Sequence, residues 1–382
     1  MQNKKYAKNP YYIVAPAFTS KSAGIRLIYI LCDLLNRKGC RAFIIVAGYQ
    51  DGAKPEYPYS YQVPLLSYQE SIQHIHSGMN PIVIRAEVGR ETMHFPATFR
   101  YILNYIGHFP GEPKEADPEF QIDKKFFWAF SKDIAKRHNI PENRVIFTPI
   151  LDTEVFFPQK TENRRGNVCY LGKYAELHST KLPKEVDESF YVFHRGGNNV
   201  PEREEYAEKF RNAELCYIYE NTSVITEALM CGCPVVCVPN DYCKFDEQDM
   251  IGLAEIGLNG IAIGTNPEEI ARAKATVHLV RERILQLMAE FETKIDFFIE
   301  ETQKISQEVR LDKVKVLKSL QRHFAKKKPN KIIRELKRAL YSVNFLEIPA
   351  ILLGSKKNEG FIVRIKFTKT PKVIKSLMRR IK

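Results

Sequence analysis

The chain has 382 residues, more than one hydrophobic core ordinarily holds, so two domains of about 150 residues are expected. Its apolar fraction of 44% and charged fraction of 27% are typical of a soluble globular protein. It has no apolar run of about 18 residues, and its start lacks the pattern of a secretory signal. These features argue against a membrane-spanning or exported protein and favour a cytoplasmic one.

The net charge of +13 is concentrated at the C-terminal end. Residues 311–382 hold 21 Lys and Arg but 4 Asp and Glu, which leaves 37 of the 58 basic and 41 of the 45 acidic residues for the rest. The body is therefore slightly acidic, and arguments about anionic partners apply to the tail alone.

The eight cysteines lie mostly inside apolar runs, which indicates reduced, buried thiols. Four of them could in principle form a zinc site, but no Cys-x-x-Cys pair occurs and two of them flank a proline and a strand. We therefore expect no metal site. The four are Cys231, Cys233, Cys237 and Cys243.

In chain order, the first 150 residues alternate between strand-like and helix-like segments. "YYIVAPAF" (11–18) is short, β-branched and aromatic, as buried strands are. The segment 25–39 has apolar residues at helical spacing and ends in a glycine. Strands are expected at 11–18, 41–48, 80–89 and 100–107. Helices are expected at 25–39 and 132–138. One further strand is expected just before the second helix, and another after it, ending at Pro149.

A polar segment, 159–167, is the best candidate for a domain linker. After it a second alternating series begins, with strands expected at 168–174, 189–198, 214–220 and 235–238 and helices at 201–213, from about 222, and over 267–307. The sequence thus predicts an α/β fold of two Rossmann-like, doubly wound domains facing a cleft, with a basic helical extension. The predicted domains are 1–155, 156–310 and 311–382.

The second series contains one unusual carboxylate. In "YENTSVITEALMCGCPVVCVPN" (219–240), Glu227 stands in a small, apolar helix, one turn after Ser223 and on the same face. If Asn221 or Thr222 caps this helix, its free N–H groups suit a phosphate, and Glu227 lies too deep to serve the cap. A ribose diol would satisfy such a carboxylate. The alternative is that Glu227 pairs with an Arg or Lys, or faces solvent.

Basic groups follow two other strands of this series. Lys173 follows Gly172, Arg195 stands in "HRGG", and Lys181 lies nearby. Ligands of open parallel sheets collect outside the carboxyl ends of the strands, so Lys173 and Arg195 would face the same phosphate. The alternative is that they are solvated loop residues.

The stretch "TSVITEALMCGCPVV", preceded by a strand ending in Tyr, resembles the donor-site signature of GT-B-fold glycosyltransferases, close to family 4. "YLGKY" and "FSKDIAKRHNI…VIFTPILDTEVFFP" resemble other elements of that family, and the likeness covers much of residues 11–265. It implies a donor site in which Glu227 binds the ribose, Lys173 and Arg195 bind the diphosphate, and Thr222 and Ser223 contact its oxygens. The remaining donor-site positions are Gly172, Tyr219, Glu220, Asn221 and, in the first domain, Gly24.

The family commonly shows two glutamates separated by seven residues. Counting back from Glu227, that position holds Tyr219, with Glu220 one step later. The resemblance also implies retention of anomeric configuration without a metal ion or other cofactor, the sugar nucleotide being a co-substrate. The sequence contains no Asp-x-Asp metal motif.

In the first domain the acceptor should lie where strands end. Glu87, in "RAEVG", and His108, after Gly107, are candidates for the catalytic base. The alternative for each is a structural loop residue.

The tail contains two basic segments with helical spacing of apolar residues, 330–341 and 372–382. Basic amphipathic helices suit an anionic membrane surface, and a lipid-linked or surface-glycan acceptor would require one nearby. Packing of these apolar faces on the body is an alternative. Nucleic acid is a rival partner, which we do not expect because no nucleic-acid module is recognisable.

These features predict a glycosyltransferase, peripheral to the inner face of the membrane, with a nucleotide-sugar donor and a glycan or glycolipid acceptor. The rival functions are a GT-B-fold sugar-nucleotide epimerase and a non-catalytic glycan- or nucleic-acid-binding protein.

Overall fold

The structure is a computed structural model in which most of the chain before residue 325 is described. The described residues are 8–19, 22–46, 62–90, 92–108, 112–159, 163–172, 174–175, 182–193, 202–246, 252–324 and, for the backbone alone, 351–357 and 360–366.

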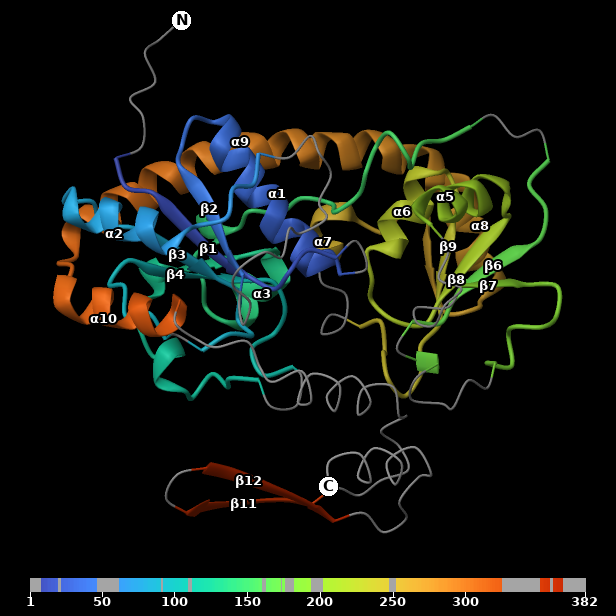
Figure 1. Cartoon of the computed structure of the whole chain (residues 1–382). Helices are drawn as coiled ribbons and strands as arrows, with labels where there is room; N and C mark the ends of the chain where they lie inside the picture. The colour runs from blue at the N-terminus through green and yellow to red at the C-terminus, as the bar shows by residue number, and fades with distance from the viewer. Residues whose placement is uncertain are drawn as a thin grey trace, which may run out of the picture. The chain divides into compact units, whose positions relative to one another are not determined.

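The first half of the chain forms a five-stranded parallel sheet with the strand order β2-β1-β3-β4-β5 (Figure 1). β1 is an interior strand, paired with β2 and β3, and its five residues are all buried, which explains why the segment lacks the alternation of a half-exposed strand. The strands are β1 (Tyr11–Ala15), β2 (Ala42–Val46), β3 (Ile82–Arg85), β4 (Thr98–Ile102) and β5 (Phe127–Ala129).

Helices cover both faces of this sheet, because successive strand residues point to opposite sides. Tyr11, Ile13 and Ala15 pack with α1 (Ala23–Arg37) and the second part of α9 (Val280–Glu308). Tyr12 and Val14 belong to the opposite face, which α2 (Tyr68–His76) and α10 (Lys313–Phe324) cover. The remaining elements of this half are α3 (Lys132–Arg137) and three short 3-10 turns, η1 (Pro118–Phe120), η2 (Lys124–Phe126) and η3 (Glu142–Arg144).

The second half repeats the plan with the strand order β10-β9-β8-β6-β7, again all parallel. Its strands are β6 (Asn167–Tyr170), β7 (Tyr191–Phe193), β8 (Leu215–Ile218), β9 (Val235–Cys237) and β10 (Ile261–Ile263). Its helical elements are α5 (Arg203–Asn212), α6 (Val224–Met230), α7 (Leu253–Ile256), α8 (Pro267–Thr276) and η4 (Val277–Leu279). The predicted fold class, two doubly wound α/β halves, is confirmed.

Both sheets share one topology. Counted within each half, the order is 2-1-3-4-5, so the direction of winding reverses between β1 and β3 and again between β6 and β8. Ligands of such sheets bind outside the carboxyl ends of the strands at this switch point. The residues after β1, β3, β6 and β8 are therefore the first place to look for a site.

Helix α9 contributes to both cores. Val280 and Ile284 pack in the second half, while Ile295 and Phe298 pack against the first sheet. Its end is held by paired hydrogen bonds: the Asn9 N–H donates to Gln303 Oε1 (3.1 Å), and Gln303 Nε2 donates to the Asn9 carbonyl (2.7 Å). The predicted boundaries between domains remain a prediction, but this helix joins the cores of the two halves.

Two elements differ from the sequence-based expectations, and the segment expected as a linker contacts the second half. The strand expected through Pro149 is reduced to one bridge between Val145 and Ala129. In the expected linker, Arg164 donates to the carbonyls of Phe210, Ala213 and Cys231. Within the basic extension α10 is helical, but β11 (Ile351–Lys357) and β12 (Gly360–Lys366) form an antiparallel hairpin, part of a separate compact unit.

The predicted burial of the cysteines is confirmed for all eight. Burial raises the pKa of the Cys231 and Cys233 thiols to about 12, so both stay protonated at neutral pH. Within the described residues, no helix combines the length and the hydropathy needed to cross a bilayer.

Candidate functional site

The switch point of the second sheet brings Gly172 and Glu220 into direct contact. Gly172 follows β6 with φ +58°, and a Cβ at this position would lie 2.1 Å from Glu220 Oε1. Glu220 follows β8 and is buried. A side chain at position 172 would force the Glu220 side chain to move, because its carboxylate occupies the space beside the backbone.

The neighbouring Tyr219 is held by its own contacts. Its side chain is buried, its hydroxyl donates to Glu185 Oε2 (3.3 Å), and its ring lies 5.1 Å from that of Tyr174. Burial raises the pKa of the phenol, so Tyr219 is neutral. The position that holds a glutamate in family 4 is thus filled here by a packed aromatic residue.

The start of α6 is less suited to phosphate than the sequence indicates. The capping residue is Ser223, which has helical dihedral angles, and its side chain makes no capping hydrogen bond. Thr222 Oγ1 instead accepts a long bond from the Val224 N–H (3.4 Å), while Asn221 is half-buried. A seven-residue helix also has a small dipole, so the phosphate role predicted for this end has little support from α6 alone.

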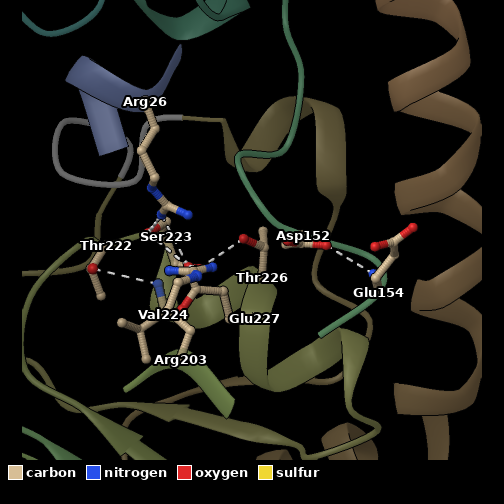
Figure 2. A network of polar contacts seen from close by, with 9 residues as sticks. All are labelled: Arg26, Asp152, Glu154, Arg203, Thr222, Ser223, Val224, Thr226 and Glu227. Carbon is tan, nitrogen blue, oxygen red and sulfur yellow. Dashed lines mark hydrogen bonds and ion pairs between the residues drawn. The ribbon is translucent and has the colours of Figure 1, made fainter. Parts of the chain in front are cut away.

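Glu227 is buried inside a network of donors (Figure 2). Its Oε1 accepts from Arg26 Nη2 (3.1 Å), Arg203 Nη2 (3.2 Å) and Ser223 Oγ (3.4 Å). The predicted sharing of one helix face by Ser223 and Glu227 is confirmed. The structure also shows the pairing with arginine that the sequence left as an alternative.

The second oxygen of this carboxylate is in a different position. Oε2 of Glu227 accepts no hydrogen bond from the part of the chain that the structure describes. The side chain is only 4% exposed. Because Oε2 is not among the fully buried polar atoms that lack a partner, it keeps some access from outside, and a hydroxyl of a ligand can donate to it.

The two arginines come from different halves of the chain. Arg26 lies in the first turn of α1, which follows the switch-point strand β1, and it also donates to Ser223 Oγ (3.0 Å). Arg203 is the first residue of α5, and its guanidinium lies 4.7 Å from the centroid of the Phe156 ring. Sequence analysis missed both arginines. Each lies at or near the start of a helix that follows a strand of its sheet, and this position is the signal that could have found them.

In the first half, Glu87 lies just after β3 at the switch point and is buried. The Leu103 N–H donates to its Oε2 (2.8 Å). Burial raises the pKa of this carboxyl to about 7, which outweighs the lowering by that hydrogen bond. Glu87 can therefore exchange a proton near neutral pH.

The other two predicted residues of the first half follow β1 and β4. Gly24 is in the first turn of α1, and a Cβ there would meet only Leu103 Cδ1, at 3.6 Å, so this position does not require glycine. His108 is exposed and follows Gly107, which has φ +76°.

A buried histidine that the sequence did not point to holds the segment before His108. The Ile106 N–H donates to His138 Nε2 (3.3 Å), while Nδ1 of the same ring contacts Glu115. Burial lowers the pKa of His138, against the opposing effect of Glu115. His138 thereby fixes the backbone of this segment to α3.

Some predicted residues lie outside the described part of the chain. These are Lys173, Lys181 and Arg195, and the tail segments 330–341 and 372–382.

Comparison with known proteins gives structural likeness alone. No family model and no curated protein matches the sequence. Solved structures similar to this chain include AviGT4, a glycosyltransferase involved in avilamycin A biosynthesis (12% identity, 79% of this chain and 99% of that one, TM-score 0.42). They also include the glycosyltransferase SnogD from Streptomyces nogalater (12%, 76% and 99%, TM-score 0.41) and T4 phage BGT in complex with UDP and Mn²⁺ (13%, 78% and 99%, TM-score 0.35). At TM-scores below 0.5, these likenesses support no inference about the activity, the substrate or individual residues of this chain.

Proposed function

We propose that the chain is a glycosyltransferase that moves a sugar from a nucleoside diphosphate to an acceptor hydroxyl. The observation that carries the proposal is Glu227, a buried carboxylate with Oε1 held by three donors and Oε2 without a donor from the described residues. A ribose diol supplies two hydroxyl donors, which such an oxygen can accept. Its two hydrogen bonds would fix the nucleoside on α6.

The surroundings of Glu227 support a nucleotide. The Gly172–Glu220 contact lies after β6 and β8, at the switch point of the second sheet, where nucleotides bind in doubly wound folds. Lys173 follows Gly172 directly, and Arg195 follows β7. On the resemblance to family 4 we assign both to the diphosphate, whose charge as a leaving group they would stabilise.

The transfer breaks the bond between the sugar's anomeric carbon and the diphosphate oxygen and forms one to the acceptor oxygen. The nucleoside diphosphate leaves, and the acceptor hydroxyl gives up its proton. We assign that proton to Glu87, whose pKa of about 7 suits a base at neutral pH, with the exposed His108 as the second candidate. Retention of configuration, which requires the acceptor to attack on the face from which the diphosphate leaves, and independence from metal ions are carried over from the resemblance and belong to the proposal.

Nucleotide binding tests the donor site directly. Thermal unfolding of the wild type is measured with UDP, GDP, dTDP, ADP and CMP, each in large excess. A ligand at a hundred times its dissociation constant adds about 2.7 kcal/mol to the free energy of unfolding. We expect one nucleotide to stabilise the wild type and to lose most of that effect in Glu227→Gln.

The matched control is Glu214→Gln, which removes a carboxylate of the same half that is about half exposed and paired with Lys274. It should keep the full stabilisation by the nucleotide. If no nucleotide stabilises the wild type, or if Glu227→Gln responds as the wild type does, the donor site is not at Glu227. A nucleotide sugar that is epimerised without any acceptor would instead indicate an epimerase.

We further propose a lipid-linked or surface-glycan acceptor on an anionic membrane. Helix α10 supports this, because it buries Val316 and Leu320 on the first half and exposes cations on its other side. The segments 330–341 and 372–382, for which packing on the body was the alternative, lie outside the described residues, whereas the charged side of α10 is exposed. The exposed cations are Lys313, Lys315, Lys318 and Arg322.

Flotation with lipid vesicles tests the membrane proposal. The chain should float with vesicles that contain phosphatidylglycerol, should stay behind with phosphatidylcholine alone, and should dissociate at high salt. A combined charge reversal of Lys315 and Lys318 to Glu should weaken the binding. Equal recovery with both kinds of vesicle would contradict the proposal.

A further inference from the structure

Arg26 reaches the candidate donor site from the other half of the chain. It belongs to the first turn of α1, which follows β1 in the first sheet, whereas Ser223 and Glu227 belong to α6 in the second half. A single nitrogen, Nη2, donates to both Ser223 Oγ (3.0 Å) and Glu227 Oε1 (3.1 Å). The Arg26 side chain is 12% exposed, so this contact is largely shielded from water.

The contact determines which oxygen of Glu227 is available. Oε1 is held between a guanidinium from each half and the Ser223 hydroxyl, and Arg203 is itself stacked on Phe156. A carboxylate held at one oxygen by three donors cannot rotate freely about its last side-chain bond. Its other oxygen therefore has a fixed direction, as the ligand atoms of well-supported binding sites do.

We propose that Arg26 is a positioning residue of the donor site, supplied by the first half to orient Glu227 toward the ribose. The inference rests on the proposed function, in which Glu227 Oε2 accepts from the ribose hydroxyls. It adds that the ribose site is complete only while α1 of the first half lies against α6. Nucleotide binding and the contact between α1 and α6 are then coupled. The factor by which the contact raises the affinity for the nucleotide equals the factor by which the bound nucleotide stabilises the contact.

Isothermal titration calorimetry with two matched ligands tests the coupling. The first ligand is whichever of UDP, GDP or ADP binds the wild type, and the second is its 2′,3′-dideoxy counterpart, which lacks the hydroxyls that Oε2 would accept. For Arg26→Gln we expect about tenfold weaker binding of the first ligand, within the usual range of such couplings. For the dideoxy ligand we expect a change of less than about twofold.

Two further variants test whether the effect of Arg26→Gln comes from its contact with Glu227. Arg26→Lys keeps the charge and one donor, so its affinity should fall between those of the wild type and Arg26→Gln, and it serves as the test if Arg26→Gln does not fold. Arg37→Gln is the control, because Arg37 lies on the same helix but pairs with Asp33 (2.8 Å). It should bind both ligands as the wild type does.

The outcomes separate this inference from the proposed function. If the wild type binds a nucleoside diphosphate and Arg26→Gln binds it equally well or more tightly, Arg26 does not position Glu227, although the donor site stands. Equal losses for both ligands would mean that Arg26 acts on the fold or on the phosphates, and would also overturn the inference. If the wild type binds none of UDP, GDP, ADP, dTDP and CMP, the proposed function fails and this inference fails with it.

Discussion

Glu220 can lie against residue 172 because Gly172 has no Cβ atom. Gly172 has φ +58°, a conformation that favours glycine, and its missing Cβ leaves room for a buried carboxylate. A glycine in this conformation elsewhere, Gly166, has φ +69°, and a Cβ added there would meet no atom within 4 Å. The two glycines thus share a backbone requirement but differ in their surroundings.

We predict that Gly172→Ala lowers the free energy of unfolding by about 2–4 kcal/mol, the sum of backbone strain and a steric clash. Gly166→Ala should lower it by only about 1 kcal/mol, because strain acts there alone. Urea unfolding of both variants measures the difference. The double variant Gly172→Ala with Glu220→Ala should recover part of the loss, and equal effects of the two glycine substitutions would contradict the role given to Glu220.

Glu87 makes stability depend on pH in a defined direction. Its carboxyl titrates near pH 4.5 in the unfolded chain and near pH 7 in the folded protein, because burial favours the protonated form. Between these values the folded state binds the extra proton, so the free energy of unfolding falls as the pH rises from about 4.5 to 7.

We predict that Glu87→Gln removes this dependence, since the Gln amide oxygen can still accept from the Leu103 N–H. The variant should match the wild type near pH 4.5 and exceed its free energy of unfolding by up to about 3 kcal/mol at pH 8. Denaturant titrations at both pH values give the comparison. If Glu87 is also the base, transferase activity of the wild type should rise through about pH 7, and the more stable variant should be inactive.

At the level of elements, Arg164 joins the ends of two helices. Its guanidinium donates to the Phe210 and Ala213 carbonyls at the end of α5 and to the Cys231 carbonyl at the end of α6. These carbonyls have no partner within their own helices, so a cation at this point satisfies their hydrogen bonds and opposes the helix dipoles.

We predict that Arg164→Met lowers the free energy of unfolding by about 2–3 kcal/mol, because it removes three hydrogen bonds from a charged donor. Arg165→Met is the control, since Arg165 is the next residue and its side chain is exposed. Thermal unfolding of the two variants should differ clearly. If both variants lost the same stability, the positive charge of the segment would be what stabilises the fold, and not the hydrogen bonds of Arg164 to the helix ends.

The positions of most elements follow from local patterns in the sequence. Apolar runs and helical spacing place β1, α1 and α5 within a few residues of their observed bounds, because each pattern reflects burial of one segment. The β11–β12 hairpin was not foreseen, since the helical spacing of the tail concerned 330–341 and 372–382 and no element was predicted between them.

The candidate site was only partly predictable. The sharing of one face by Ser223 and Glu227 depends on helix geometry alone and could be foreseen. The contact between Arg26 and Glu227 joins residues 201 apart in sequence, and nothing in a single sequence indicates such a pair. The same holds for the strand order that places Gly172 beside Glu220, because topology follows from packing of the whole sheet.

At the level of the whole molecule, α9 joins the two halves. Its first turns belong to the second core and its later turns to the first, with the exposed Ala289 between Ile284 and Ile295. Because one continuous helix belongs to both cores, unfolding of one core destabilises the other. We therefore expect the wild type to unfold in a single transition.

We predict that Ala289→Pro uncouples the halves, since proline interrupts the helix at a cost of about 3 kcal/mol or more without removing a core side chain. Differential scanning calorimetry should then show two transitions in place of one. Ala289→Gly is the matched control, with a cost of about 1 kcal/mol and a single transition. A single, cooperative transition in Ala289→Pro would mean that the halves are coupled through other contacts.

The docking of α9 on the first sheet also has a consequence during synthesis. The apolar face formed by Tyr11, Ile13 and Phe99 is covered by Phe298 and its neighbours, which leave the ribosome some two hundred residues later. At the usual rate of about 5–20 residues per second, the part of that face that α9 covers remains exposed for roughly ten to forty seconds. The nascent chain therefore presents to chaperones a first sheet that still lacks α9, before the residues of the candidate site are all synthesised and packed.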